Sequence, residues 1–174
     1  KSHGQMFVPL GELQLVFNNH HNFDNYYREL DIEKAIAKTS YKLGDVTYTR
    51  EVLASQPDRI IVMHLSASKP HSLSFTAFYL PALPKAEIKT NKAKQLIISG
   101  TTIDHEGVKG MIRYKGISQI KTEGGSYSLT DKSLTIQNAD AATIYISIAT
   151  NFNNYQDVNG NESVRAAAYL HKVN

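Results

Sequence analysis

The stretch KAIAKTSYKLGDVTYTREVLA, Lys34–Ala54, decides the fold class of this chain. On both sides of Gly44 and Asp45, successive side chains fall on opposite faces in a pattern of period two, which predicts two β-strands. A two-residue loop that begins with glycine favours a type II′ turn, because glycine adopts a positive φ at little cost. The stretch therefore predicts an antiparallel hairpin.

The same alternation continues along most of the chain. Arg59–Ala67 is apolar on both faces, which indicates a central strand of a sheet. Short turns join most of the predicted strands, and about ten such strands favour two packed antiparallel sheets over a βαβ fold. We therefore expect an all-β fold, an antiparallel sandwich. The other predicted strands are Gly11–Phe17, Ser72–Phe78, Gln95–Gly100, Gly110–Ile120, Ser126–Thr130, Ser133–Asn138 and Ala142–Thr150.

The C-terminal segment has a different character. Residues 151–161 are rich in asparagine and predict an irregular loop. Glu162–Lys172 predicts a short helix, with an acid in its first turn and a base in its last. We expect residues 1–150 to form the sandwich domain, and residues 151–174 to form a loop and the start of a linker helix. The side chains at helical spacing are Val164, Ala167, Ala168 and His171.

The composition excludes several classes of protein. The 174 residues include no cysteine, which excludes disulfides, a thiol nucleophile and a thiolate metal site. The net charge is only +3. The densest basic stretch of the chain, Lys85–Lys94, predicts a solvated loop or edge rather than a nucleic-acid site. No apolar run reaches the ~20 residues that cross a bilayer, so we expect no membrane insertion. No phosphate-binding glycine loop is present, and we expect no cofactor.

Two clusters of titratable residues could carry chemistry. His20 and His21 with Asp24 are metal-ligating types, but adjacent side chains of a strand point to opposite faces, which favours a polar loop. Asp104–Glu106 could hold a general base, although its turn-like context favours a hairpin tip. The carboxylates between Asp24 and Glu33 show no spacing that marks an acid pair for glycoside chemistry. We therefore expect no catalytic residue and no metal ligand in this chain.

Tyrosine is unusually common, with ten residues. Aromatic faces can stack on sugar rings, so the tyrosines favour a carbohydrate-binding surface as one alternative. Most of them lie inside strand patterns, which favours core or cross-strand packing.

Several motifs resemble those of a known family. Val8–Leu13 (VPLGEL) resembles the QPLGDL opening of the N-terminal domain of family 95 glycoside hydrolases, with Glu12 in place of the usual Asp. Tyr27–Ile32 (YRELDI), followed by Ala35–Ala37, resembles their YRRELDL…AxA strand pair. Similarity extends over nearly the whole chain from Val8. The further matching segments are Val46–Ser55 (VTYTREVLAS), Pro57–Val62, Lys69–Phe75, Gly124-Gly125, Ala139–Thr143 and Ala149–Phe152.

This resemblance implies a fold and a function. Members of the family share one domain plan: an N-terminal β super-sandwich, a helical linker, an (α/α)6 barrel and a C-terminal β domain. They include α-L-fucosidases that cleave α-1,2-linked fucose with inversion, and some α-L-galactosidases. Their catalytic Glu and Asn lie in the barrel, which no part of this chain resembles, so the resemblance assigns no catalytic residue here. It implies a non-catalytic N-terminal domain whose partner is the barrel of the same parent chain.

The resemblance also implies a location and a contact region. Glycan-degrading relatives usually work in the periplasm or outside the cell, so we expect a periplasmic or extracellular protein. The loop after the last strand is expected to lie toward the absent barrel. Its interdomain or substrate-rim candidates are Asn151, Asn153, Tyr155 and Asp157. Without the barrel, an apolar patch of Val164, Ala168 and Leu170 is expected to be exposed.

Two alternatives stay open. One is a free-standing carbohydrate-binding module for fucosylated glycans, which the tyrosines favour. The other is an assembly domain that dimerises through an edge strand.

Overall fold

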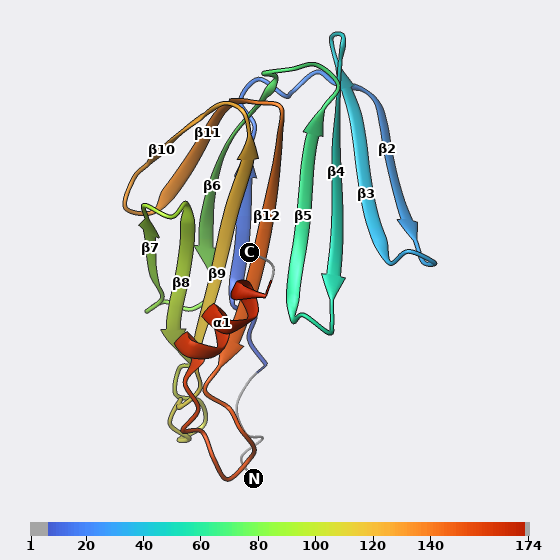
Figure 1. Cartoon of the computed structure of the whole chain (residues 1–174). Coiled ribbons are helices and arrows are strands. Elements are labelled where there is room, and N and C mark those ends of the chain that lie inside the picture. The colour runs from blue at the N-terminus through green and yellow to red at the C-terminus, as the bar shows by residue number, and fades with distance from the viewer. Residues whose placement is uncertain (1–6, 173–174) are drawn as a thin grey trace.

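The computed structural model describes residues 7–172, which form two antiparallel β-sheets and one short helix (Figure 1). The all-β sandwich with a C-terminal helix is therefore confirmed. The elements are β1 (Gly11–Val16), β2 (Asp24–Asp31), β3 (Ile36–Leu43), β4 (Val46–Ser55), β5 (Ile60–Ala67), β6 (Leu73–Pro81), β7 (Glu87–Asn91), β8 (Gln95–Thr101), β9 (Arg113–Glu123), β10 (Ser126–Leu129), β11 (Ser133–Ala139), β12 (Ala141–Thr150) and α1 (Glu162–His171).

The two sheets differ in width. The small sheet has the strand order β1-β6-β11-β10, and the large sheet has the order β2-β3-β4-β5-β12-β9-β8-β7. The strand predicted to be central, β5, does lie inside the large sheet between β4 and β12. The lysine-rich stretch expected to be a loop or an edge contains β7, the edge strand next to β8.

The decisive stretch forms the predicted hairpin. Leu43 of β3 pairs with Val46 of β4, which leaves a two-residue loop. Of the two loop residues, only Gly44 has a positive φ, of 57°, as a type II′ turn requires.

The main core lies between the two sheets. In β6 the alternate residues Leu73, Phe75 and Ala77 are buried, and they pack against Ile120 of β9 and Ile144 of β12. The polar residues between them point away, because side chains of a strand alternate between faces. The predicted pattern of β6 is therefore confirmed, although the strand continues to Pro81, beyond the predicted end at Phe78.

The large sheet extends beyond the small one, and Figure 1 shows β2, β3 and β4 standing to one side without a second sheet over them. We call β2–β4 the wing. Every residue of β2 except Asp31 is exposed. Leu30 keeps 67% of its surface exposed, and Ile32 keeps 85%.

Helix α1 packs against β9 and β12 on the face of the large sheet opposite the small sheet (Figure 1). Ala166 and Leu170 are buried there against Ile117 and Ala149. The expected exposed patch of Val164, Ala168 and Leu170 is therefore wrong for Leu170. The expected stripe of the helix also lies on the wrong face, because the position of α1 on the sheet, rather than helical spacing alone, decides which face is buried. Residues of that stripe are exposed, namely Val164, Ala167, Ala168 and His171.

Candidate functional site

The loop between β12 and α1 carries the four predicted interdomain residues, and the first of them is a structural anchor. Asn151 is fully buried. Its side-chain oxygen accepts a hydrogen bond from the backbone N–H of Arg113 at 2.8 Å. Its amide nitrogen donates to the carbonyl oxygens of Met111 at 3.0 Å and Val158 at 2.6 Å. Asn151 thus ties the base of this loop to the segment before β9, and it offers no group to a partner.

Two of the other predicted residues, Asn153 and Asp157, are brought together. The Asn153 amide donates to the Asp157 carboxylate at 2.7 Å. This bond, with that from the backbone N–H of Asn159, lowers the pKa of Asp157. The carboxylate is therefore ionised at neutral pH and closes the loop rather than acting as an acid.

Arg165 of α1 holds the same loop from the helix side and was missed by sequence reasoning. Its guanidinium donates to the carbonyl oxygens of Thr150 and Phe152, both at 2.9 Å, and to the side-chain oxygen of Asn153. The available signal was general: an irregular loop leaves carbonyl groups that need donors, and an arginine follows this loop.

The remaining predicted residue, Tyr155, stands apart. It lies near the middle of the loop, between Asn154 and Asp157, whose backbones pair as a bridge. Tyr155 keeps 86% of its surface exposed. The structure thus links Asn153 and Asp157, places Asn151 beneath them and leaves Tyr155 in solvent.

A hollow of about 490 Å³ lies beside this loop. It is lined by Arg59, Phe152, Arg165 and Tyr169, among others. The Arg59 guanidinium donates to the Tyr169 hydroxyl at 2.8 Å and lies 5.3 Å from the ring centroid of the same residue. The hollow is therefore bounded by cations that already have partners within the domain.

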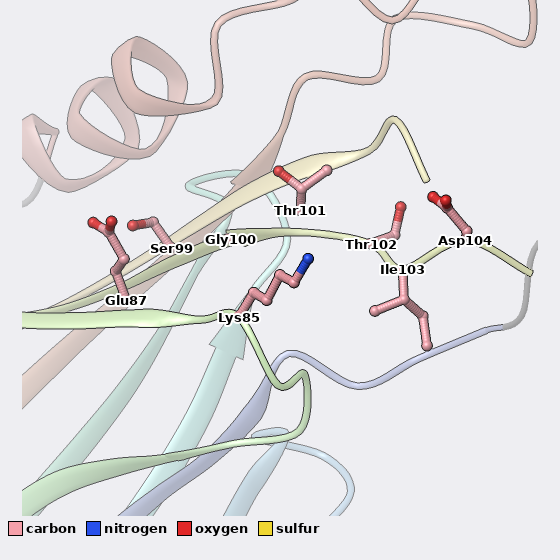
Figure 2. Close-up of a pocket in the computed structure, with 8 residues that line it drawn as sticks. All are labelled: Lys85, Glu87, Ser99, Gly100, Thr101, Thr102, Ile103 and Asp104. Carbon is pink, nitrogen blue, oxygen red and sulfur yellow. The ribbon is translucent and has the colours of Figure 1, made fainter. Parts of the chain in front are cut away.

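A second hollow, of about 580 Å³, lies at the edge formed by β7 and β8 (Figure 2). Lys85 extends into it toward Thr101 and Thr102, while Glu87 and Asp104 stand at its two ends (Figure 2). The hydrogen bond from Lys89, at 2.8 Å, lowers the pKa of Glu87. Its carboxyl group is therefore a poor general acid, because that role needs a raised pKa.

Asp104 closes a loop in the same region. Its carboxylate accepts a hydrogen bond from the Gly110 N–H at 2.9 Å, and the backbones of His105 and Val108 pair as a bridge. The predicted hairpin tip at Asp104–Glu106 is thus observed.

A third hollow, of about 470 Å³, lies on the wing and is walled by aromatic rings and arginines. We call it the aromatic cleft. Its side chains come from the segment after β1 and from the inward face of the three wing strands. They are Phe17, His20, Phe23, Tyr26, Arg28, Thr39, Tyr41 and Arg50.

His20, predicted to lie in a polar loop, contributes to this cleft. A ring nitrogen of His20 lies 2.8 Å from the Tyr41 hydroxyl, and the ring packs edge-on against Tyr48 with centroids 4.5 Å apart. Burial lowers the pKa of His20, and the neighbouring His21 adds to the effect. Among residues 7–172, no group of three His, Asp or Glu side chains is arranged to hold a metal ion.

Some tyrosines are buried in the core and others are exposed to solvent. Tyr48, Tyr79 and Tyr114 are buried, whereas Tyr26 and Tyr27 of the wing are about half exposed. The preference for core packing therefore holds in the covered sheets and at Tyr48 of β4, and it fails on the edge strand β2.

Four carboxyl groups of the described chain have a clearly shifted pKa, and each is lowered. Hydrogen bonds from Lys34 lower the pKa of Asp31. Burial raises the pKa of Glu162, but a backbone hydrogen bond and Arg113 outweigh it. With Glu87 and Asp157, these groups favour binding and structure over proton donation.

The helix found between residues 7 and 172 is too short to cross a bilayer.

Three comparisons place this chain among known proteins. The chain is 33% identical to alpha-L-fucosidase 2 of Arabidopsis thaliana in an alignment of 169 residues that covers 84% of this chain and 20% of that protein. The chain therefore spans about a fifth of the length of this relative. A solved structure from the human microbiome, assigned as a kojibiose phosphorylase, matches 95% of this chain and 25% of its own, with a TM-score of 0.64 and 12% identity. That likeness shows the shared fold alone.

The expected resemblance to the N-terminal domain of a fucosidase-like glycoside hydrolase is thus confirmed. The matching profile is described under the number 65, whereas the motifs suggested family 95. The sequence profile described as glycosyl hydrolase family 65, N-terminal domain, matches residues 1–155, and the chain belongs to that family.

Proposed function

We propose that this chain is the non-catalytic N-terminal domain of a larger α-L-fucosidase-like glycoside hydrolase. The observation that carries the proposal is the long match to alpha-L-fucosidase 2, which takes up most of this chain but only 20% of that relative. The parent enzyme would belong to family 95 and hydrolyse α-L-fucosyl or α-L-galactosyl linkages with inversion, in the periplasm or outside the cell. The catalytic groups would lie on an (α/α)6 barrel in the remaining chain.

In this role the domain braces the barrel. The loop from Asn151 to Asp157 would face it, with the exposed Tyr155 as the contact and the bonded Asn153 and Asp157 as its support. A loop held by Arg165 keeps its shape before docking, which lowers the entropic cost of the contact.

Fragment complementation tests this function. The segment encoded downstream is expressed with and without this chain, and hydrolysis of an aryl α-L-fucoside is measured. We expect no turnover by this chain alone, and activity of the barrel only when this chain is present. Turnover by this chain alone, or a downstream segment without a barrel, would overturn the proposal.

The contact region has its own test in the reconstituted enzyme. Tyr155→Ala is expected to weaken association of the two segments, whereas Tyr127→Ala, on the exposed side of β10, serves as the matched control. Equal effects of the two substitutions would remove the loop from the interface.

A free-standing carbohydrate-binding module is the second candidate, and the aromatic cleft favours it. The two candidates separate in one experiment. Binding of fucosylated oligosaccharides by this chain, together with a barrel that is active without it, would support the module over the bracing domain.

A further inference from the structure

The aromatic cleft is shaped by an irregularity in the edge strand. Along the β2–β3 pair, Asp24 faces Lys42 and Tyr27 faces Ser40, so β2 carries one extra residue. Asn25 takes a left-handed backbone, with φ of 52°. A β-bulge of this kind re-aims side chains at a sheet edge, and here Tyr26 lines the cleft beside Arg28.

The rings of the cleft contact one another in a continuous wall. The Phe23 centroid lies 5.8 Å from that of Tyr26 and 5.3 Å from that of Tyr41. On the other side, Phe17 lies 5.3 Å from His20. Phe23 and Tyr26 are close to half exposed, so the wall presents ring surface to solvent.

Two arginines stand in this wall without acidic partners. Arg28 and Arg50 flank Thr39 in register on three neighbouring strands, which places their backbones roughly 10 Å apart at the usual strand spacing. Across residues 7–172, the ion pairs of the wing involve Asp31, Lys34, Lys38 and Glu51 rather than these arginines. The cleft therefore holds two positive charges.

Arg50 is also incompletely bonded. Its Nε is buried and has no hydrogen-bond partner among the described residues, while the guanidinium lies 5.3 Å from the Phe17 ring centroid. A buried donor without a partner costs free energy, and an anion bound in the cleft would relieve both this cost and the repulsion between like charges.

We propose that the aromatic cleft binds an acidic sugar unit of a glycan, one that carries a carboxylate or a sulfate ester. Aromatic faces pack on the apolar C–H face of a pyranose ring, and guanidinium groups bind planar or tetrahedral oxyanions by paired hydrogen bonds. The volume of about 470 Å³ suits a small ligand. The choice of a sugar rests on the proposed glycoside-hydrolase function, and the choice of an acidic one rests on the two unpaired arginines.

The charges set this ligand apart from the fucosylated glycans expected above. A neutral sugar would stack on the rings but leave both guanidinium groups without an anion. The cleft would therefore hold an acidic part of a polysaccharide near the barrel and leave the choice of the cleaved sugar to the barrel.

Titration of this chain with matched oligosaccharides tests the inference. The probes are a galacturonic acid trimer, a neutral galactose trimer and a sulfated galactose trimer, each followed by calorimetry and by amide chemical shifts. We expect at least one acidic probe to bind about tenfold more tightly than the neutral one, which corresponds to one charge-assisted hydrogen bond. The two acidic probes show whether a carboxylate or a sulfate is preferred. The shifts should map to β2, β3 and β4.

Matched substitutions locate the site. Arg28→Gln is expected to lower affinity for the preferred acidic probe about tenfold, and Tyr26→Ala to lower affinity for acidic and neutral probes alike. Arg59→Gln removes the same charge from a different hollow and should change neither. Because Arg28 and Tyr26 are exposed on an edge strand, both variants should fold.

Two results would overturn the inference: equal affinity for acidic and neutral trimers, or an unchanged affinity of Arg28→Gln for the preferred acidic trimer. Failure of this titration with successful complementation of the barrel would remove the acidic-sugar site and leave the proposed function standing. Successful titration with failed complementation would remove the proposed function and leave the acidic-sugar site standing.

Discussion

The two halves of the large sheet share one sequence pattern but differ in what lies over them. β9 and β12 are covered by the small sheet on one face and by α1 on the other, whereas the wing has no second layer over most of its length (Figure 1). Ile144 of β12 is fully buried, and Leu30 of β2 is largely exposed. Alternation therefore specifies a strand in both halves, but only coverage by another layer turns an apolar side chain into stabilising core. The uncovered half keeps its rings and charges available for a ligand.

The largest expected effect compares the two halves directly. Ile144→Ala leaves a cavity between the sheets and should lower the free energy of unfolding by about 4 kcal/mol. Leu30→Ala removes an exposed side chain and should change it by less than about 0.5 kcal/mol. Urea unfolding followed by circular dichroism measures both. Losses of similar size would mean that the wing is packed as tightly as the covered half.

A second comparison tests the helix as a covering layer. Leu170 is buried against the sheet, while Val164 on the same helix has 63% of its surface exposed. Leu170→Ala should cost about 3 kcal/mol, and Val164→Ala should cost less than about 0.5 kcal/mol. If thermal unfolding shows the opposite order, then α1 does not dock on β9 and β12 through the face described above.

A third comparison concerns the loop that joins the covered half to α1. Asn151→Ala leaves buried groups without partners and should cost about 2 kcal/mol. Asn153→Ala removes bonds near solvent and should cost less than about 1 kcal/mol. Urea midpoints of the two variants check this order. A larger loss in Asn153→Ala would reverse the assignment of Asn151 as the anchor.

The smallest expected effect is a pH dependence of stability that arises at His20 in the aromatic cleft. Because burial lowers the folded-state pKa of His20 below its ordinary 6.5, the unfolded chain binds more protons in the window between the two values. Stability therefore rises with pH through this window, is fully present above 6.5, and is lost as pH falls through the folded pKa. His20→Asn should flatten the slope of unfolding free energy against pH below 6.5. An unchanged slope would assign the dependence to other groups.

The sequence predicted most of the fold because its signals are local. The Gly44-Asp45 turn, the alternation in β6 and the limits of α1 follow from backbone preferences and periodicity, and the structure confirms them. The orientation of α1 was not predictable in this way. Val164 and Leu170 are both apolar, and only the position of the sheet decides which of them is buried.

The candidate sites show the same division. The asparagine-rich loop was recognisable as a loop, but the burial of Asn151 depends on Arg113, which is distant in sequence. The aromatic cleft joins residues from Phe17 to Arg50 across four segments, and its bulge at Asn25 has no clear signal in the sequence. Arg28 and Arg50 became a pair only through the strand register.

The sequence by itself determined most of the strands, the hairpin turn, the helix and the resemblance to an N-terminal domain of a glycoside hydrolase, since each is encoded by neighbouring residues or by motifs. The tertiary structure alone decided which strands are covered, which face of α1 is buried, and which charges meet in the aromatic cleft. The physical reason is that burial and electrostatic pairing depend on distances between segments that are remote along the chain.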